Sequence, residues 1–180
     1  MPSPSIAALL VAAGTGSRFG AATPKQFLTL LGRPVIRWAA EALVPEIPLL
    51  QPVGPAEPIA AALRGLPHLP PVPGGATRQA SVRAGLEALA PHQPTFVLVH
   101  DAARPFIPPG TVTALRAALA RTEGAIPAVA VADTLKRSDG AGAIAATVPR
   151  EGLFRAQTPQ GFRFAELLRL HRAASDGEAT

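Results

Sequence analysis

The sequence predicts an α/β fold built on a largely parallel sheet, and three observations support this prediction. Strand-like segments alternate with helix-like segments along the chain. The strand-like segments are continuous apolar runs, which is typical of strands covered by helices on both faces. The chain has 180 residues, of which 48% are hydrophobic, so it can bury a core of its own. Neither a repeat nor a linker interrupts it, so we expect one domain over residues 1–180.

In the first half of the chain, each predicted element has a local cause. Residues 6–13 (IAALLVAA) are uniformly apolar and end at Gly14, which predicts a buried strand followed by a tight turn. Pro34 suits the first position of a helix, so a helix is predicted over residues 35–43. The stretch 44–73 holds nine prolines, and only a short strand near Leu49 is predicted there.

The second half continues the alternation. Residues 74–77 open a predicted helix that ends near Leu89, and residues 95–100 predict a second buried strand. A helix over 111–121, a third buried strand over 126–132 and a final helix over 161–174 complete the prediction.

Between the third strand and the final helix, residues 134–150 are polar and rich in glycine and alanine. They carry the turn signal Ser138-Asp139-Gly140, so we predict an extended hairpin arm. Because a two-stranded hairpin is marginally stable alone, this arm needs a surface to pack on.

The composition excludes several classes of site and of protein. There is no cysteine, which excludes a disulfide scaffold, a thiolate metal site and a cysteine nucleophile. The four histidines form no pair at i, i+4 spacing. No signal-peptide pattern opens the chain, and the apolar run 6–13 is far shorter than the roughly 20 residues of a membrane span. We therefore expect a soluble, cytoplasmic protein without a membrane partner.

The charge distribution indicates a small anionic ligand. The net charge is +5, yet no dense basic run occurs and aromatic residues make up only 4%, which disfavours a nucleic-acid partner. The first forty residues contain no acid but carry Arg18, Lys25, Arg33 and Arg37. Such a local excess of positive charge beside a glycine-rich turn suits a nucleotide.

The turn after the first strand is not one of the common nucleotide-binding motifs. In the pattern G-x-G-x-x-G the third glycine would fall on Phe19, and no P-loop sequence occurs in the chain. Its backbone N–H groups can still bind phosphate oxygens, although a tight turn alone would also explain the glycines. Lys25, one of only two lysines, follows nearby as a compact charge suited to a single phosphate group.

Four blocks of the chain resemble a known family. They are residues 10–18 (LVAAGTGSR) with Pro24-Lys25-Gln26, residues 99–105 (VHDAARP), residues 133–137 (DTLKR) and residues 147–160 (TVPREGLFRAQTPQ). The first resembles the signature loop of nucleotidyltransferases that activate sugar and alditol phosphates. All four together, in this order, resemble the 2-C-methyl-D-erythritol 4-phosphate cytidylyltransferases of the non-mevalonate isoprenoid pathway.

This resemblance implies a Rossmann-like three-layer sandwich forming a single nucleotidyltransferase domain over residues 1–180. It also implies a protruding β-arm at about 134–150 that embraces a second subunit of a homodimer. The implied reaction couples CTP with methylerythritol phosphate by in-line attack on the CTP α-phosphate, with release of pyrophosphate. Because a phosphate nucleophile is already ionised at neutral pH, such a reaction needs cations and a metal more than a base. Strand alternation also predicts that His100 points away from Asp101.

The resemblance assigns roles to individual residues. Catalysis would use Arg18, Lys25 and Arg150. The nucleotide would be bound by Ala12, Ala13, Gly14, Gly16, Gly75, Ser81 and Asp101, and Asp101 would also hold Mg²⁺ or another divalent cation. The alditol phosphate would be gripped by Arg104, Thr134, Arg150 and Thr158, of which Arg150 and Thr134 would reach across the dimer. Ala76 stands where relatives often place an acid, so selectivity for CTP would rest more on the backbone.

Other interpretations remain open at this point. Enzymes that make CDP-ribitol share much of the loop and the D-A-A-R-P pattern, so ribitol 5-phosphate is an alternative substrate. A non-catalytic CTP-binding or dimerisation module is a second alternative, and a structural arginine-rich protein is disfavoured by the four ordered blocks. For Thr134 and Thr158, capping of a strand end is an equally good role. Family members continue for a few tens of residues beyond the position of Thr180, and we expect that segment to be missing here.

Overall fold

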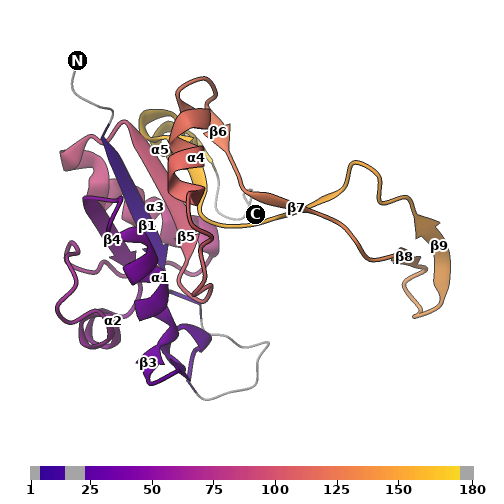
Figure 1. The fold of residues 1–180 in the computed structure, drawn as a ribbon, viewed down its shortest axis with the longest axis horizontal. Coiled ribbons are helices and arrows are strands. Elements are labelled where there is room, and N and C mark those ends of the chain that lie inside the picture. Colours follow the sequence, from indigo (N-terminus) through magenta and orange to yellow (C-terminus); the bar gives the residue numbers. More distant parts are fainter. Residues whose placement is uncertain (1–4, 15–22, 175–180) are drawn as a thin grey trace.

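The computed structural model describes residues 5–14 and 23–174 (Figure 1). Within these residues the central sheet has five strands in the order β4 (Leu49–Val53), β1 (Ile6–Val11), β5 (Phe96–Asp101), β11 (Gln160–Arg163) and β6 (Gly124–Ala125). β1 pairs in parallel with both β4 and β5, whereas β11 is antiparallel to its two neighbours. β6 therefore runs in the direction of β5, and the sheet is mostly parallel, as predicted.

Helices cover both faces of this sheet (Figure 1). They are α1 (Val35–Leu43), α2 (Ala56–Ala62), α3 (Arg78–Leu89), α4 (Thr111–Leu119) and α5 (Phe164–Ala173). Ala8 and Leu10 of β1 pack in one buried cluster with α1, α2 and α4, whereas Ala7 and Leu9 pack in another with α3 and α5. Alternate residues of one strand thus enter two cores, because successive side chains of a strand point to opposite faces. The predicted three-layer sandwich is confirmed.

Short elements hold the segment after the first turn against the body. A 3₁₀ helix, η2 (Lys25–Phe27), leads into a hairpin of β2 (Thr29–Leu30) and β3 (Arg33–Pro34), and α1 follows directly. The Val35 N–H donates to the carbonyl oxygen of Leu28 (2.9 Å), and the indole N–H of Trp38 donates to that of Leu30 (2.9 Å). These bonds hold the segment that follows Lys25 against α1. A second 3₁₀ helix, η3 (Ala90–His92), extends α3.

Helix α2 lies in the proline-rich stretch where only a strand was predicted. Pro58 falls in the first turn of α2, where a backbone N–H has no partner within the helix and its loss costs little. Proline counting therefore underestimated the helical content of residues 44–73. Among the residues that the structure describes, no helix combines the length and apolarity that crossing a membrane requires.

The prediction of a buried strand over residues 126–132 is wrong. The chain leaves the central sheet after β6, and β7 (Ala128–Ala130) pairs antiparallel with β10 (Phe154–Ala156) in a separate two-stranded sheet. Ile126 and Val129 are each 48% exposed. Apolar composition cannot distinguish a strand inside a sheet from one on an extension. The predicted final helix also begins later than expected, because residues 160–163 form β11 and only then does α5 begin.

The hairpin arm is present where it was predicted. β8 (Leu135–Ser138) and β9 (Ile144–Val148) pair antiparallel, and β7 with β10 forms the stem that joins them to the body (Figure 1). Asp139 closes the turn, since its Oδ1 accepts the N–H groups of Ala141 (2.8 Å) and Ala143 (3.1 Å). The arm extends away from the body and buries almost none of its own residues.

Helices α3 and α5 are joined at their surface by charged and ionisable groups. Arg172 donates to both carboxylate oxygens of Glu87 (2.8 and 2.6 Å), and this bond lowers the pKa of Glu87. Next to it, burial lowers the pKa of His171, and the guanidinium groups of Arg83 and Arg78 lower it further. The folded protein therefore favours the neutral form of His171 more than the unfolded chain does.

This gives a prediction for stability against pH. Because the folded-state pKa of His171 lies below its ordinary value of 6.5, the contribution of His171 is present above that value and is lost as pH falls through the folded-state pKa. Urea unfolding of the wild type should show stability declining as pH falls below about 6.5. His171→Gln should make the decline shallower, and Arg83→Gln should reduce it by less, because burial remains. Equal slopes in all three proteins would contradict this account.

Gly54 provides a second stability prediction. Its φ is +150°, and an added Cβ would lie 2.9 Å from the carbonyl carbon of Ala12 and 3.0 Å from its oxygen. Gly54→Ala should therefore cost about 3 kcal/mol of unfolding free energy, from backbone strain plus this contact. Gly65→Ala is the matched control, because Gly65 has φ +83° but nothing within 4 Å of the added Cβ. It should cost only the strain, about 1 to 2 kcal/mol. Equal losses in denaturant titrations would show that the contact with Ala12 does not matter.

Candidate active site

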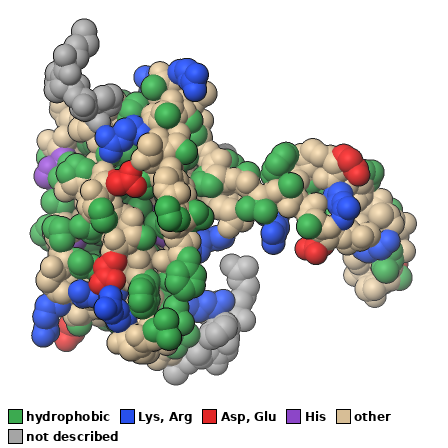
Figure 2. Space-filling view, in the orientation of Figure 1, with side chains coloured by type: hydrophobic (Ala, Val, Ile, Leu, Met, Phe, Trp, Pro, Cys, Tyr) green, Lys and Arg blue, Asp and Glu red, His purple; other side chains and the backbone are tan. Residues whose placement is uncertain are grey.

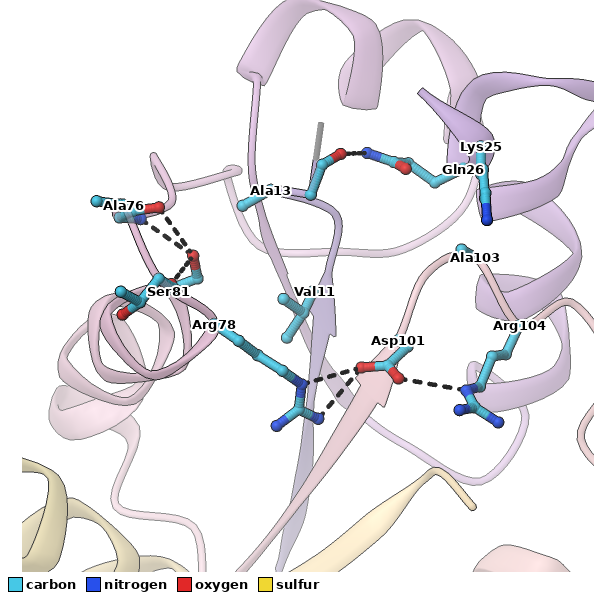
Figure 3. A pocket seen from close by; sticks show the side chains of 13 residues that line it. Val11, Ala13, Lys25, Gln26, Ala76, Arg78, Ser81, Asp101, Ala103 and Arg104 are labelled. Atoms are coloured by element: carbon cyan, nitrogen blue, oxygen red, sulfur yellow. Dashed lines mark hydrogen bonds and ion pairs between the residues drawn. The ribbon is translucent and has the colours of Figure 1, made fainter. Parts of the chain in front are cut away.

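The candidate site lies where β1 and β5 end together. Their parallel register pairs Val11 with Asp101, so the last residues of both strands lie at one edge of the sheet. A cavity of about 800 Å³ opens there, lined by the turn after β1, by η2, by the start of α3 and by the turn after β5 (Figure 3). This carboxyl edge is where α/β sheets usually bind ligands.

Gln26 holds the start of the turn after β1 through two hydrogen bonds. Its amide Nε2 donates to the carbonyl oxygens of Ala12 (2.7 Å) and Gly14 (2.9 Å), and the side chain is buried. The Ala12 N–H in turn donates to the carbonyl of Val53 (2.7 Å). Among the predicted nucleotide-binding residues, Ala13 and Gly14 line the cavity, and Ala12 lies buried behind them. Gly16 and Arg18 lie outside the described residues.

Gln26 was not predicted as a site residue, although it stands in the Pro24-Lys25-Gln26 block. Its two carbonyl partners are 14 and 12 positions away in sequence, so the contact could be identified only from the folded structure. Lys25, its neighbour and a predicted catalytic residue, lines the cavity.

The start of α3 forms the opposite wall. Thr77 caps the helix, because its Oγ1 accepts the Ala80 N–H (3.0 Å). Ser81 is buried; its hydroxyl accepts the N–H of Gly75 (3.1 Å) and donates to the carbonyl of Thr77 (2.9 Å) (Figure 3). An added Cβ at Gly75 would lie 2.4 Å from that of Ala80, so the loop fits closely onto the helix. Gly75 and Ser81, which were predicted to bind the nucleotide, both line the cavity.

Asp101 lies between two arginines on the cavity floor. Arg78 approaches its Oδ1 (3.2 Å) and Arg104 its Oδ2 (3.3 Å), and all three side chains are partly exposed (Figure 3). Arg104 also donates to Oε1 of Gln157 (2.9 Å). The sequence identified Asp101 and Arg104 but not Arg78. As the first residue of a helix that follows a glycine turn, Arg78 had a position that could have indicated it, but its partner is 23 positions away.

His100 points to the other side of β5, as predicted. It is fully buried, and that burial lowers its pKa. One ring nitrogen, Nε2, contacts the carbonyl oxygen of Arg104 (3.0 Å), and the other, Nδ1, contacts Oγ1 of Thr158 (3.0 Å). Thr158, predicted to bind the alditol phosphate, is not among the residues that line the cavity, and its Oγ1 lies 3.5 Å from the Asp101 N.

Thr134 and Arg150 are not brought to this cavity within one chain. Both lie on the exposed arm, where Arg150 donates to the carbonyl oxygen of Ala132 (Figure 1). Their predicted role requires an arm from another subunit.

The electrostatics of the cavity favour an anion. Of the described residues that line it, Lys25, Arg78 and Arg104 are cationic and Asp101 is the one acid. No group of three or more histidine, aspartate or glutamate side chains within residues 5–14 and 23–174 could hold a metal ion by itself. Mg²⁺ is commonly bound by one or two carboxylates plus substrate phosphates, so the single carboxylate of Asp101 would fit this ion together with a phosphate ligand.

The sequence matches the family model of 2-C-methyl-D-erythritol 4-phosphate cytidylyltransferase (IspD) over residues 6–180. The bifunctional IspD/IspF enzyme of Granulibacter bethesdensis is 62% identical over 167 residues, which are 93% of this chain and 44% of that protein. The bifunctional enzyme of Gluconobacter oxydans is 56% identical over 179 residues, 95% of this chain and 46% of that protein. The chain thus spans less than half the length of these curated relatives.

Solved structures agree with this assignment. The 2-C-methyl-D-erythritol 4-phosphate cytidylyltransferase of Thermus thermophilus superposes with a TM-score of 0.77 at 34% identity, covering 97% of this chain and 80% of that one. The 4-diphosphocytidyl-2C-methyl-D-erythritol synthase of Anaerococcus prevotii gives a TM-score of 0.80 at 28% identity, covering 99% and 79%. The fold, the ordered sequence blocks and the cavity at the ends of β1 and β5 lead to one conclusion: this chain belongs to the 2-C-methyl-D-erythritol 4-phosphate cytidylyltransferase family.

Proposed function

We propose that this chain catalyses the transfer of a cytidylyl group from CTP to 2-C-methyl-D-erythritol 4-phosphate, with release of pyrophosphate, in isoprenoid precursor biosynthesis. The observation that carries the proposal is the cavity at the carboxyl edge, lined by the cations Lys25, Arg78 and Arg104 and by Asp101, the one acid among its described lining residues. Three cations beside a backbone turn suit a reaction in which several phosphate groups meet.

The nucleotide would lie between the turn after β1 and the start of α3. The triphosphate would meet the backbone of residues 12–16 and Lys25, and the cytosine would approach Gly75 and Ser81. Gly75 lines this part of the cavity without a side chain, and an added Cβ would meet Ala80 of α3 at 2.4 Å. Ala76 adds no polar group there, so discrimination between CTP and UTP would depend on backbone hydrogen bonds.

The chemistry needs charge stabilisation more than proton transfer. The substrate phosphate attacks the α-phosphorus of CTP opposite the leaving pyrophosphate, and Lys25 together with Arg18 would stabilise the charge that develops there. Both ring nitrogens of His100, the histidine next to Asp101, are occupied inside the protein, which supports a reaction without a histidine base.

Asp101 would hold Mg²⁺, or another divalent cation, against the triphosphate. Its carboxylate is partly exposed to the cavity, and its two arginine partners are at 3.2 and 3.3 Å, so the ion pairs can exchange for a metal. When bound, the metal would neutralise phosphate charge and orient the leaving group.

The alditol phosphate would lie beside Arg104 and the segment around Thr158. Arg150 and Thr134 would come from the arm of a second copy of the chain, in a cytoplasmic homodimer whose ligands are the two substrates. Uncovered apolar side chains on the arm and its stem support this assembly. Ile144 on the arm is 68% exposed, Phe154 on the stem is 63% exposed, and hydrophobic atoms lie along both in the space-filling view (Figure 2).

The direct test measures pyrophosphate release. Purified protein with Mg²⁺ and CTP should release pyrophosphate when methylerythritol phosphate is added, and much more slowly with ribitol 5-phosphate. Product identity would be checked by mass spectrometry. Turnover with ribitol 5-phosphate alone would replace the proposed substrate, and CTP binding without turnover of either alditol phosphate would indicate a binding module.

Lys25→Ala should lower turnover by roughly 10²–10³, the usual effect of removing a donor that stabilises transition-state charge. The KM for CTP should change much less, because Lys25 responds to the charge that develops during the reaction. Arg121→Ala, a change at an exposed cation beyond the end of α4, is the control and should leave both constants unchanged. A raised KM at unchanged turnover would make Lys25 an ordinary binding charge.

Asp101→Asn should reduce activity and weaken its dependence on magnesium together. Asparagine keeps the shape of the side chain but loses the charge that holds a divalent cation. Activity would be titrated against Mg²⁺ concentration for both proteins. Full activity of Asp101→Asn at low magnesium would remove Asp101 from the metal site.

The shared site can be tested by mixing two inactive variants. In a mixed dimer of Arg150→Ala and Lys25→Ala chains, both lesions fall in one composite site and the other site is intact. After subunit exchange at equal concentrations, about a quarter of the wild-type activity should return, because half of the dimers are mixed and each holds one good site. No recovered activity, despite exchange shown by mass spectrometry, would contradict a site completed by the partner's arm.

A further inference from the structure

Three segments that line or support the cavity meet at one buried side chain, His100. They are the end of β5, which carries Asp101, the turn 102–104, which carries Arg104, and the segment 157–158 before β11. His100 has no exposed surface, and each of its ring nitrogens contacts a different one of the other two segments. It is therefore the point at which these segments are joined.

The hydrogen bonds fix which nitrogen carries the proton. A carbonyl oxygen can only accept, so Nε2 of His100 is protonated and donates to the carbonyl of Arg104 at 3.0 Å. Nδ1 of the neutral ring is then an acceptor, and the hydroxyl of Thr158 donates to it at 3.0 Å. The oxygen of Thr158 remains free to accept the N–H of Asp101, which lies at 3.5 Å. The chain of donors runs from Asp101 through Thr158 and His100 to Arg104.

This series of hydrogen bonds holds the backbone of Asp101 and of Arg104, the two residues that would face the substrates. With its carbonyl held by His100, Arg104 directs its guanidinium to Asp101 on one side (3.3 Å) and to Gln157 on the other (2.9 Å). Gln157 is the neighbour of Thr158. Both partners of the Arg104 guanidinium, Asp101 and Gln157, therefore depend on the hydrogen bonds of His100. Breaking one bond would leave a buried polar group without a partner, which proteins rarely tolerate.

We propose that His100 is a positioning residue, which holds Arg104 and Thr158 in place through its two ring nitrogens and so sets the binding of the alditol phosphate. The inference rests on the proposed function for the identity of that substrate. His100 touches neither substrate and transfers no proton.

Four variants and two kinetic constants test this role. His100→Phe keeps the ring but loses both hydrogen bonds, and it should raise the KM for methylerythritol phosphate about 10-fold or more while the KM for CTP changes less. His100→Gln can still donate to the Arg104 carbonyl, so its effect should be smaller. Thr158→Val removes the hydroxyl, and His92→Phe, at an exposed histidine, is the matched control and should change nothing.

The double variant separates positioning from direct contact. If Thr158 and His100 act as one unit, then His100→Phe with Thr158→Val should cost clearly less than the product of the two single effects. If the effects multiply, Thr158 acts on the substrate by itself and the proposal is overturned. It is equally overturned if His100→Phe raises the two KM values to the same extent.

A spectroscopic signature keeps the proposal testable if His100→Phe fails to fold or if no transferase activity is found. In protein labelled with ¹⁵N-histidine, His100 should give a protonated Nε2 and an unprotonated, hydrogen-bonded Nδ1. Thr158→Val should shift the Nδ1 resonance, and Thr158→Ser should keep it near the wild-type position. An Nδ1–H tautomer, or no response of the Nδ1 resonance to Thr158→Val, would refute the two hydrogen bonds of the His100 ring. The proposed function fails separately, by the absence of pyrophosphate release from the wild type.

Discussion

The parallel register of β1 and β5 is the constraint on which the rest of the site depends. Because Val11 pairs with Asp101, the two strands end at one level, and the turns that follow them face the same cavity. The register is in turn determined by burial: alternate residues of β1 fill two separate cores, so a shift by one residue would exchange the faces. The packing that stabilises the fold therefore also places the functional turns.

The backbone of the turns around the cavity is held by hydrogen bonds of uncharged side chains. Gln26 holds the two carbonyls of the first turn, Ser81 holds the glycine loop, and His100 joins the second turn to the segment before β11. All three side chains are buried. A buried polar side chain with all its bonds made specifies one local geometry, since any other arrangement leaves an unsatisfied group.

At the cavity surface the protein uses charges instead. Asp101 is shared by Arg78 and Arg104, with all three partly exposed. Exposed ion pairs of this kind contribute only about 0 to 1 kcal/mol, so they cost little to open. In the proposed function, the arginines would exchange the Asp101 carboxylate for a phosphate group, and Asp101 would exchange an arginine for a metal ion. Uncharged hydrogen bonds that hold the turns, combined with weak ion pairs at the cavity surface, are suited to binding a polyanion.

The sequence by itself determined the elements with a strong local cause. The apolar run of β1, the proline before α1, the capped start of α3 and the turn residues of the arm each act within a few positions. The resemblance predicted the family and seven of the thirteen described residues that line the cavity. Only the tertiary structure decided which strands pair and which side chains distant in sequence contact each other. It placed β11 antiparallel beside β5, left the segment 126–132 exposed, and paired Arg78 with Asp101. It also turned Gln26 onto the first turn and His100 onto Thr158, 58 positions away. The physical reason is that local pattern encodes periodicity and caps, whereas the partner of a polar side chain depends on strand order and register, which only the packed chain determines.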